Sequence, residues 1–209
     1  MSSLVIICCA VGYFLGSFPA GYFAGRLAGV DIRSLGSGNI GATNVLRTLG
    51  KHWGYPVFAI DALKGFVAVR LAFLLVKYWP AAQPYAEYIA ILTAIMSVAG
   101  HMFPVWLRFK GGKGVATSAG ALFGLMPWVV PCVFLVWFIV FEISRYVSLA
   151  SIIAAISLPI IAGLFAYWRF IDTSALVYFS ILIMALVLWR HRSNFSRLLK
   201  GTEQRFSRK

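Results

Sequence analysis

The sequence predicts an all-α, polytopic integral membrane protein with about seven transmembrane helices, some of them short. Of its 209 residues 61% are hydrophobic and only 12% are charged, and the mean hydropathy is +0.85. Soluble domains are typically about half apolar and about a quarter charged. Apolar stretches long enough to cross a bilayer recur along the chain. The clearest are at about residues 4–29, 88–107, 147–168 and 174–189.

Proline positions and charge set the expected number of spans. Three basic segments are expected on the cytoplasmic side, at residues 30–52, 107–114 and 190–209. If the N-terminus lies outside, this arrangement requires an odd number of crossings. Pro127 and Pro131 disfavour a continuous helix, so we expect two short helices there, at about 115–128 and 131–145. With five long spans, these two short helices give seven. We expect a single membrane-embedded domain over residues 1–209 that ends in the basic tail.

The positive charge favours a membrane surface over nucleic acid. The formal net charge is +13, and the tail at residues 190–209 alone holds seven Lys or Arg. The basic residues fall in short loops between spans and in this tail, which is the positive-inside pattern. The aromatic residues lie within the spans, whereas nucleic-acid-binding surfaces interleave them with basic ones. We therefore expect anionic membrane lipids as partners of the tail, and no nucleic acid.

A glycine-rich polar run between Gly36 and Gly50 is the first candidate anion site. Glycines let backbone N–H groups approach an anion, Ser, Thr and Asn add donors, and Arg adds charge. If a helix begins near Gly41, the positive end of its dipole also points at the anion. Thr43 then lies on the same helix face as Asn39, Asn44 and Arg47. A flexible polar loop is the alternative. The candidate phosphate ligands are Ser37, Gly38, Asn39, Asn44 and Arg47.

A second cluster of glycine and lysine follows at Lys110–Gly114, with Lys110, Gly112 and Lys113 as candidate phosphate ligands. It is not a Walker A loop, because the spacing G-x-x-x-x-G-K-[ST] is absent and Lys113 is followed by Gly114. Nucleotide hydrolysis is therefore disfavoured. The alternative is an ordinary basic loop on the cytoplasmic side.

Polar residues at two further span ends are candidates for the same site. His191 and Asn194 are three residues apart just after the last span, so a continuing helix would place them on one face. An interfacial anchor is the alternative. Ser148 and Ser151 lie one helical turn apart after Arg145, and their alternative is a helix-start cap.

Two charged residues within an expected span are interpreted as part of the fold and not as catalytic groups. Asp61 and Lys64 are spaced i, i+3 in an apolar segment, where charge is costly unless it is paired. We expect a structural ion pair near the site. His101 lies at a span end and is expected to be a packed interfacial histidine and not a base. The three cysteines have no paired spacing and no nearby histidine, so we expect no metal site.

Six strings of the sequence together resemble the bacterial acyl-phosphate:glycerol-3-phosphate acyltransferases, the PlsY family. The resemblance runs in order from about Gly16 to Arg205, and several long strings that match at once are highly specific. The strings are Gly36–Asn44, Asp61–Gly65, Gly100–Pro104, Phe109–Thr117, Arg145–Ser151 and Arg190–Asn194.

The resemblance implies a multi-pass enzyme of the bacterial inner membrane that begins phospholipid synthesis. It implies transfer of a fatty acyl group from acyl phosphate to the sn-1 hydroxyl of glycerol 3-phosphate, which gives lysophosphatidate and phosphate. Neither acyl-CoA nor acyl carrier protein is the expected donor, and no cofactor is expected. The active site is expected on the cytoplasmic side, with the N-terminus outside and the C-terminus in the cytoplasm.

The chemistry of the donor agrees with these residues. Acyl phosphate is an activated mixed anhydride, so the enzyme mainly brings two phosphorylated molecules together and aligns a hydroxyl on the carbonyl. The sequence has no G-x-S-x-G elbow, so we expect direct transfer without an acyl-serine. We expect a monomer in which phosphate is bound by Ser37, Arg47 and Lys113. His191 and Asn194 would orient glycerol 3-phosphate and, with Ser37, are the catalytic candidates.

Two functions from other classes stay open at this point. A transporter or channel for an anionic solute would use the same basic loops as a gate. Transporters commonly contain two related halves, and the sequence has no internal repeat. A membrane scaffold that binds anionic lipid would need neither the glycine loops nor the histidine and asparagine after the last span.

Overall fold

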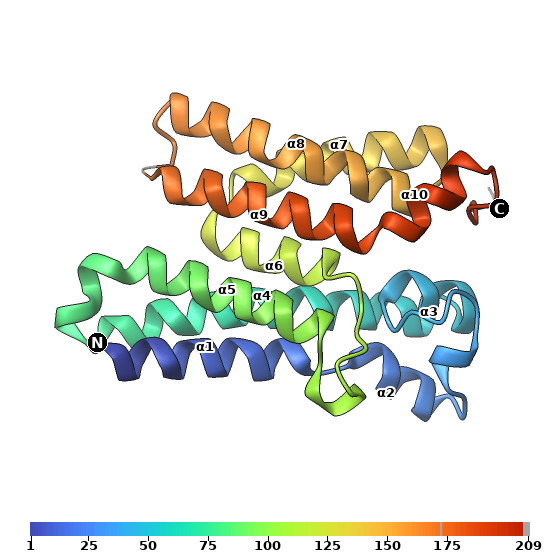
Figure 1. Cartoon of the computed structure of the whole chain (residues 1–209), viewed down its shortest axis with the longest axis horizontal. Coiled ribbons are helices and arrows are strands. Elements are labelled where there is room, and N and C mark those ends of the chain that lie inside the picture. Colours follow the sequence, from blue (N-terminus) through green and yellow to red (C-terminus); the bar gives the residue numbers. More distant parts are fainter. Residues whose placement is uncertain (172, 207–209) are drawn as a thin grey trace. The chain divides into compact units, whose positions relative to one another are not determined.

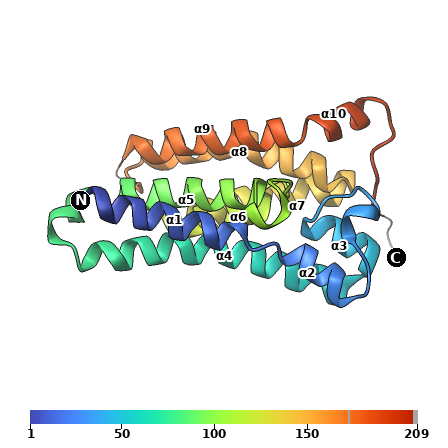
Figure 2. The same ribbon diagram turned by 60° about the horizontal axis from the view of Figure 1, so that its bottom comes forward.

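The computed structural model describes residues 1–171 and 173–206, which form ten α-helices and three short 3-10 helices. Within this described part of the chain no β-strand occurs, and the all-α prediction is confirmed. The helices divide into two compact units, Met1–Leu125 and Met126–Lys209, and each is described by itself. Figure 1 and Figure 2 show the course of the chain in both units. The single-domain assignment stays a prediction.

Unit 1 is a bundle in which α4 packs against α1, α5 and α6, and α1 also lies along α5 (Figure 1). Its helices are α1 (Ser2–Ser17), α2 (Ala20–Leu27), α3 (Ala42–Leu49), α4 (Lys51–Lys77), α5 (Ala86–Met102) and α6 (Val115–Leu125). Its 3-10 helices are η1 (Ile32–Ser34), η2 (Pro80–Tyr85) and η3 (Val105–Leu107).

Small residues let the helices of unit 1 approach closely. A Cβ at Gly16 of α1 would lie 1.9 Å from the Ser97 carbonyl oxygen of α5, and one at Gly120 of α6 would lie 1.8 Å from the Ala62 carbonyl oxygen of α4. Lipid tails are as apolar as leucine, so membrane helices associate through such backbone contact and not through a hydrophobic driving force.

Unit 2 contains α7 (Val129–Ser144), α8 (Val147–Tyr167), α9 (Ser174–Arg190) and α10 (Arg192–Leu199), and α8 packs against α7 and α9. The chain bends by 57° between α9 and α10. His191 occupies this bend. The continuing helix expected after residue 189 is therefore wrong, because the helix ends before His191 and a new one starts after it.

Proline explains where two predicted boundaries differ from the structure. The span expected at residues 4–29 is two helices, α1 and α2, because the Phe18–Pro19 pair interrupts it. The break near Pro127 is present as predicted. Pro131, however, lies in the first turn of α7, where no N–H partner is needed, so it does not limit a helix. The two short helices therefore cover residues 115–125 and 129–144.

Apart from residues 4–29, which α1 and α2 divide between them, each expected span corresponds to one α-helix. By length and composition the segments Ser2–Leu27, Pro80–Leu107 and Val147–Tyr167 can cross a membrane, and the bent pair α9 and α10 adds a fourth candidate. The apolar helices α6 and α7 are shorter, and α4 is 27 residues long but carries charged side chains. An α-helix rises 1.5 Å per residue, so the 11 residues of α6 cover only about 16 Å of a core about 30 Å thick.

Candidate active site

The first glycine run forms an ordered loop around the side chain of Asn44. This side chain is buried, with only 3% of the residue exposed. Its Oδ1 accepts a hydrogen bond from the Ser37 backbone N–H at 2.9 Å. Its Nδ2 donates to the carbonyl oxygens of Leu35 and Asn39 at 3.0 and 2.9 Å, and more weakly to Ile32 at 3.3 Å. Asn44 therefore shapes the loop from within.

Two glycines allow the chain to turn tightly on either side of Ser37. Gly36 and Gly38 have φ values of 56° and 69°, in the left-handed region that favours glycine. A Cβ at Gly36 would also lie 2.4 Å from the Asn44 Oδ1 atom. Ser37 is exposed at the tip between them. The loop thus presents the serine while its neighbours hold the backbone in place.

The helix predicted to begin near Gly41 is present as α3. The Asn39 side chain accepts a hydrogen bond from the Gly41 N–H at 2.8 Å just before the helix starts. Arg47 lies in its last turn and is partly exposed. This short helix thus connects the serine loop to a cation at its other end.

The second glycine cluster folds back along the end of α5. The N–H groups of Gly111 and Gly112 donate to the carbonyl oxygens of Met102 and His101, each at 3.1 Å. These hydrogen bonds satisfy carbonyls that a helix C-terminus leaves unpaired. Lys110 is exposed and Lys113 is partly buried. The loop therefore has a defined path and is not a flexible basic linker.

The two glycine loops share one hydrophobic core within unit 1. Ile32 and Ile40 flank the first loop, Val45 belongs to α3, and Leu107 precedes the second loop. All four are buried in the same cluster, which Ala20, Ala24 and Val57 complete. Sequence spacing could not show this proximity. The structure thus anchors the flanks of both glycine loops in one core.

A buried charged cluster lies beneath the second loop. Lys64 Nζ is 2.8 Å from Asp61 Oδ1, which confirms the predicted ion pair, and it also lies 2.9 Å from His101 Nδ1. It further donates to the Phe18 carbonyl oxygen at the break between α1 and α2, at 2.9 Å. The His101 ring faces Gly112, where a Cβ would lie 2.1 Å from Nε2. His101 is buried as expected, but it has this additional charged partner.

The two candidates after the last span have separate settings within unit 2. His191 is 3% exposed, and its Nδ1 lies 2.9 Å from the Val187 carbonyl oxygen. In the neutral ring this contact assigns the hydrogen to Nδ1, so Nε2 is the acceptor. Asn194 is also buried, but its amide turns to a carboxylate on the tail.

That carboxylate is Glu203, which the sequence analysis missed. Its Oε1 accepts from Ser148 Oγ and Asn194 Nδ2, and its Oε2 accepts from Arg197 Nε, all at 2.7 Å. Burial acts to raise the pKa of Glu203, but these three hydrogen bonds and the Arg197 charge outweigh it and hold the pKa below its ordinary value. One signal was available, because Glu203 is the sole acidic residue of the basic tail.

The remaining serine candidate is also engaged. Ser151 is buried, and its Oγ accepts a hydrogen bond from Trp137 Nε1 at 3.3 Å. Within residues 1–171 and 173–206, no group of three or more His, Cys, Asp or Glu side chains is arranged to hold a metal ion.

Comparisons with known proteins identify the family. The model of the family described as glycerol-3-phosphate acyltransferase matches residues 6–201. The chain belongs to this family. A glycerol-3-phosphate acyltransferase of Aquifex aeolicus (strain VF5) is 46% identical over 194 residues, which cover 93% of this chain and 95% of the relative. One from Synechococcus sp. (strain CC9902) is 44% identical over 211 residues, 100% of this chain and 98% of the relative.

Solved structures show that the likeness extends to the fold of this acyltransferase. Crystal structures of PlsY (YgiH), an integral membrane glycerol 3-phosphate acyltransferase, are similar to it with TM-scores of 0.85 and 0.83. Their sequences are 43% and 42% identical, and the alignments cover 97% of this chain and 96% and 95% of theirs. They represent the glycerol 3-phosphate form and the lysophosphatidic acid form of that protein. The chain is thus a multi-pass membrane enzyme, and the transporter and scaffold alternatives lose their support.

The contact between Gly112 and His101 predicts a rescue experiment. The φ of Gly112 is not left-handed, so the strain of Gly112→Ala arises from the His101 ring, which supplies its three nearest atoms. We expect Gly112→Ala to lower stability by about 1–3 kcal/mol and to reduce acyltransferase turnover. In the double variant with His101→Ala the effect of the added methyl group should largely disappear.

The measurement is a double-mutant cycle in melting temperature and turnover. Gly163→Ala is the control, because among the described residues no atom beyond the adjoining turns of its own helix lies within 4 Å of the added Cβ. Additive effects of Gly112→Ala and His101→Ala would show that the ring does not position this loop.

The lowered pKa of Glu203 predicts a pH-dependent stability. Its folded value lies below the unfolded value of about 4.3, so its stabilising effect is complete above that pH and is lost as pH falls through the folded value. Near neutral pH, Glu203→Gln should lower stability by about 2 kcal/mol, or roughly 4–8 °C in melting temperature.

The difference between Glu203→Gln and the parent should close in acid. Glu142→Gln is the control, because the Glu142 side chain is 40% exposed and, within residues 1–171 and 173–206, forms an ion pair with Arg145 alone. Equal melting curves for the parent and Glu203→Gln at neutral pH would contradict a stabilising role of the carboxylate.

Proposed function

We propose that this acyltransferase moves a fatty acyl group directly from acyl phosphate to the sn-1 hydroxyl of glycerol 3-phosphate. The hydroxyl oxygen forms a bond to the acyl carbon, and the bond from that carbon to the phosphate oxygen breaks. Phosphate leaves with the electron pair, and one of its oxygens takes the hydroxyl proton. The products are lysophosphatidic acid and inorganic phosphate, so the reaction needs no oxidant, cofactor or external base.

The observation that carries this proposal is the shared core of the two glycine loops. Two phosphorylated substrates repel each other, and the reaction requires them to be held side by side. Within unit 1 the residues that flank the Ser37 loop and Leu107, shortly before the Lys113 loop, belong to one buried cluster. Arg47 lies in the last turn of α3, between the Ser37 loop and α4. We assign phosphate binding to Ser37, Arg47 and Lys113. Further proposed ligands are Gly38, Asn39, Lys110 and Gly112, while Asn44 contributes by holding the Ser37 loop in place.

The roles of His191 and Asn194 follow from the atoms they present. Neutral His191 with its hydrogen on Nδ1 has an acceptor at Nε2, which suits a substrate hydroxyl. Glu203 holds the Asn194 amide in one orientation through Nδ2. We assign to both the orientation of glycerol 3-phosphate, while Ser148 and Ser151 contribute to substrate binding from α8. All these ligands come from one chain, so the proposed unit of activity is a monomer.

A direct assay tests the donor and the residue roles. Purified protein with palmitoyl phosphate and glycerol 3-phosphate should release lysophosphatidic acid and phosphate in equal amounts, whereas palmitoyl-CoA should give no product. Lys113→Ala and Arg47→Ala should each weaken substrate use about ten- to a hundred-fold, since each loses a charge-assisted phosphate contact. His191→Ala should lower turnover by about a hundred-fold or more if it assists proton transfer, and by less if it only positions glycerol 3-phosphate.

Two adjacent residues at the start of α4 supply matched controls for these variants. Lys51 and His52 are exposed, and Lys51→Ala and His52→Ala should retain parental kinetics. Transfer from acyl-CoA, or acyl-protein formed when glycerol 3-phosphate is omitted, would overturn the direct mechanism. Parental turnover in His191→Ala and Asn194→Ala would make the pair an interfacial anchor.

We also propose an orientation in a bacterial inner membrane, with the N-terminus outside and the C-terminus and active site in the cytoplasm. The seven positive charges of the tail favour the cytoplasmic side. Cysteines introduced at Ser2 and Ser207 should differ in labelling by an impermeant reagent on intact cells, with only Ser2→Cys labelled. Equal accessibility of both ends would contradict an odd number of spans.

A further inference from the structure

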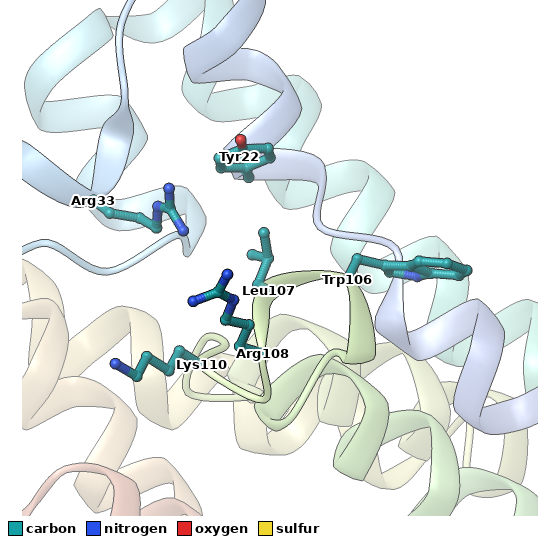
Figure 3. Close-up of a pocket in the computed structure, with 6 residues that line it drawn as sticks. All are labelled: Tyr22, Arg33, Trp106, Leu107, Arg108 and Lys110. Carbon is teal, nitrogen blue, oxygen red and sulfur yellow. The ribbon is translucent and has the colours of Figure 1, made fainter.

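A basic pocket in unit 1 has no part in the proposed acyl transfer except through Lys110. It has a volume of about 390 Å³ and lies between α2, η1 and the turn that follows α5. Its lining residues are Tyr22, Arg33, Trp106, Leu107, Arg108 and Lys110. Figure 3 shows the three cationic groups on one side of this pocket and the Trp106 indole on the other.

The pocket keeps an excess of positive charge. Arg33 is neutralised by Asp31, which accepts from its Nε and Nη2 at 2.9 and 2.7 Å. Hydrogen bonds from Arg33 lower the pKa of Asp31 to about 2, so the carboxylate stays charged at neutral pH. Arg108 and Lys110 are exposed, and among the described residues no carboxylate lies within 4 Å of either cation. These two cations are available to an anion.

The backbone under Arg108 is held in an unfavourable conformation. Arg108 and Phe109 have φ values of 51° and 62°, two successive left-handed residues that are not glycine. Such residues cost of order 1 kcal/mol each and persist where the surroundings hold them. Here two features maintain the backbone conformation. The Leu107 side chain is buried, and the Phe109 N–H donates a hydrogen bond to the Pro104 carbonyl oxygen at 3.0 Å.

The pocket lies where two candidate spans end. Ser2–Leu27 finishes beside Tyr22, and Pro80–Leu107 finishes at the turn that carries Trp106. The Trp106 side chain is exposed, and its ring centroid is 6.4 Å from that of Phe14, also exposed, on α1. Tryptophan prefers the level of lipid headgroups, and exposed aromatic residues on a span face acyl chains. The pocket therefore opens beside lipid-facing surface.

We propose that this pocket binds the phosphate headgroup of an anionic membrane phospholipid. Arg108 and Lys110 contact the phosphate, and the acyl chains lie along Trp106 and Phe14. A soluble phosphate compound would use the cations but would gain nothing from the aromatic surface. Basic pockets at span ends bind anionic headgroups, and each cation near the membrane surface contributes about a fivefold gain in affinity. The pocket shares Lys110 with the proposed acyl transfer, whereas Arg108 and Trp106 belong to the pocket alone and carry its test.

The test titrates fluorescent phosphatidylglycerol into the detergent-purified full chain. Arg108→Gln should bind it about fivefold more weakly, and Arg108→Glu about thirtyfold, because it reverses a charge. Lys51→Gln removes an exposed cation of unit 1 outside the pocket and should bind as the parent does. Binding of fluorescent phosphatidylcholine should be unchanged in all variants. Matched melting temperatures establish that each variant is folded.

Two further results separate a lipid from a soluble ligand. Trp106→Ala should weaken phosphatidylglycerol binding severalfold, and millimolar inorganic phosphate or glycerol 3-phosphate should not displace the lipid. Displacement by either soluble phosphate together with parental binding by Trp106→Ala would assign the pocket to a soluble phosphate and overturn the proposal. Parental lipid binding by both Arg108 variants would overturn it as well.

Discussion

The packing of helices in unit 1 depends on how the buried charge of Lys64 is paired. Only 6% of this residue is exposed, and an unpaired ammonium at this depth would cost several kcal/mol. Asp61 supplies the opposite charge one turn away on the same helix, and His101 of α5 supplies a ring nitrogen. The Phe18 carbonyl oxygen, which the proline at position 19 leaves outside α1 and α2, is the third partner. One charge thus connects three segments of unit 1.

This constraint reaches the candidate site through close packing and not through a chain of charges. The His101 ring that contacts Lys64 also lies against Gly112, so a shift of the ring displaces the second loop. Glu203 has a comparable position in unit 2, where one buried carboxylate joins the start of α8 to α10 through Ser148 and Asn194. In unit 1 a buried charged cluster thus supports a loop that carries proposed substrate ligands, and in unit 2 a buried carboxylate binds two such ligands on α8 and α10.

Local patterns in the sequence were sufficient for the spans, for the break at Pro127 and for α3, because each depends on neighbours within a few residues. The ion pair of Asp61 and Lys64 was predictable for the same reason. Contacts between distant segments were not. Ser148 and Glu203 are 55 residues apart, and no spacing rule connects them. The bend at His191 also escaped the sequence analysis, because arginine and histidine carry no helix-breaking signal.

The polar candidate residues fall into two groups, those whose side chains hydrogen-bond within the protein and those whose side chains are exposed. Asn44 and Ser148 direct their polar atoms to other parts of their own unit, and Ser37 stands exposed between two glycines. An acyl phosphate donor is already activated, so the protein needs rigid geometry more than a strong base or nucleophile. Buried amides and hydroxyls that hold loops in place suit that requirement. Substituting Asn44 should therefore disturb the position of Ser37 before it removes any substrate contact.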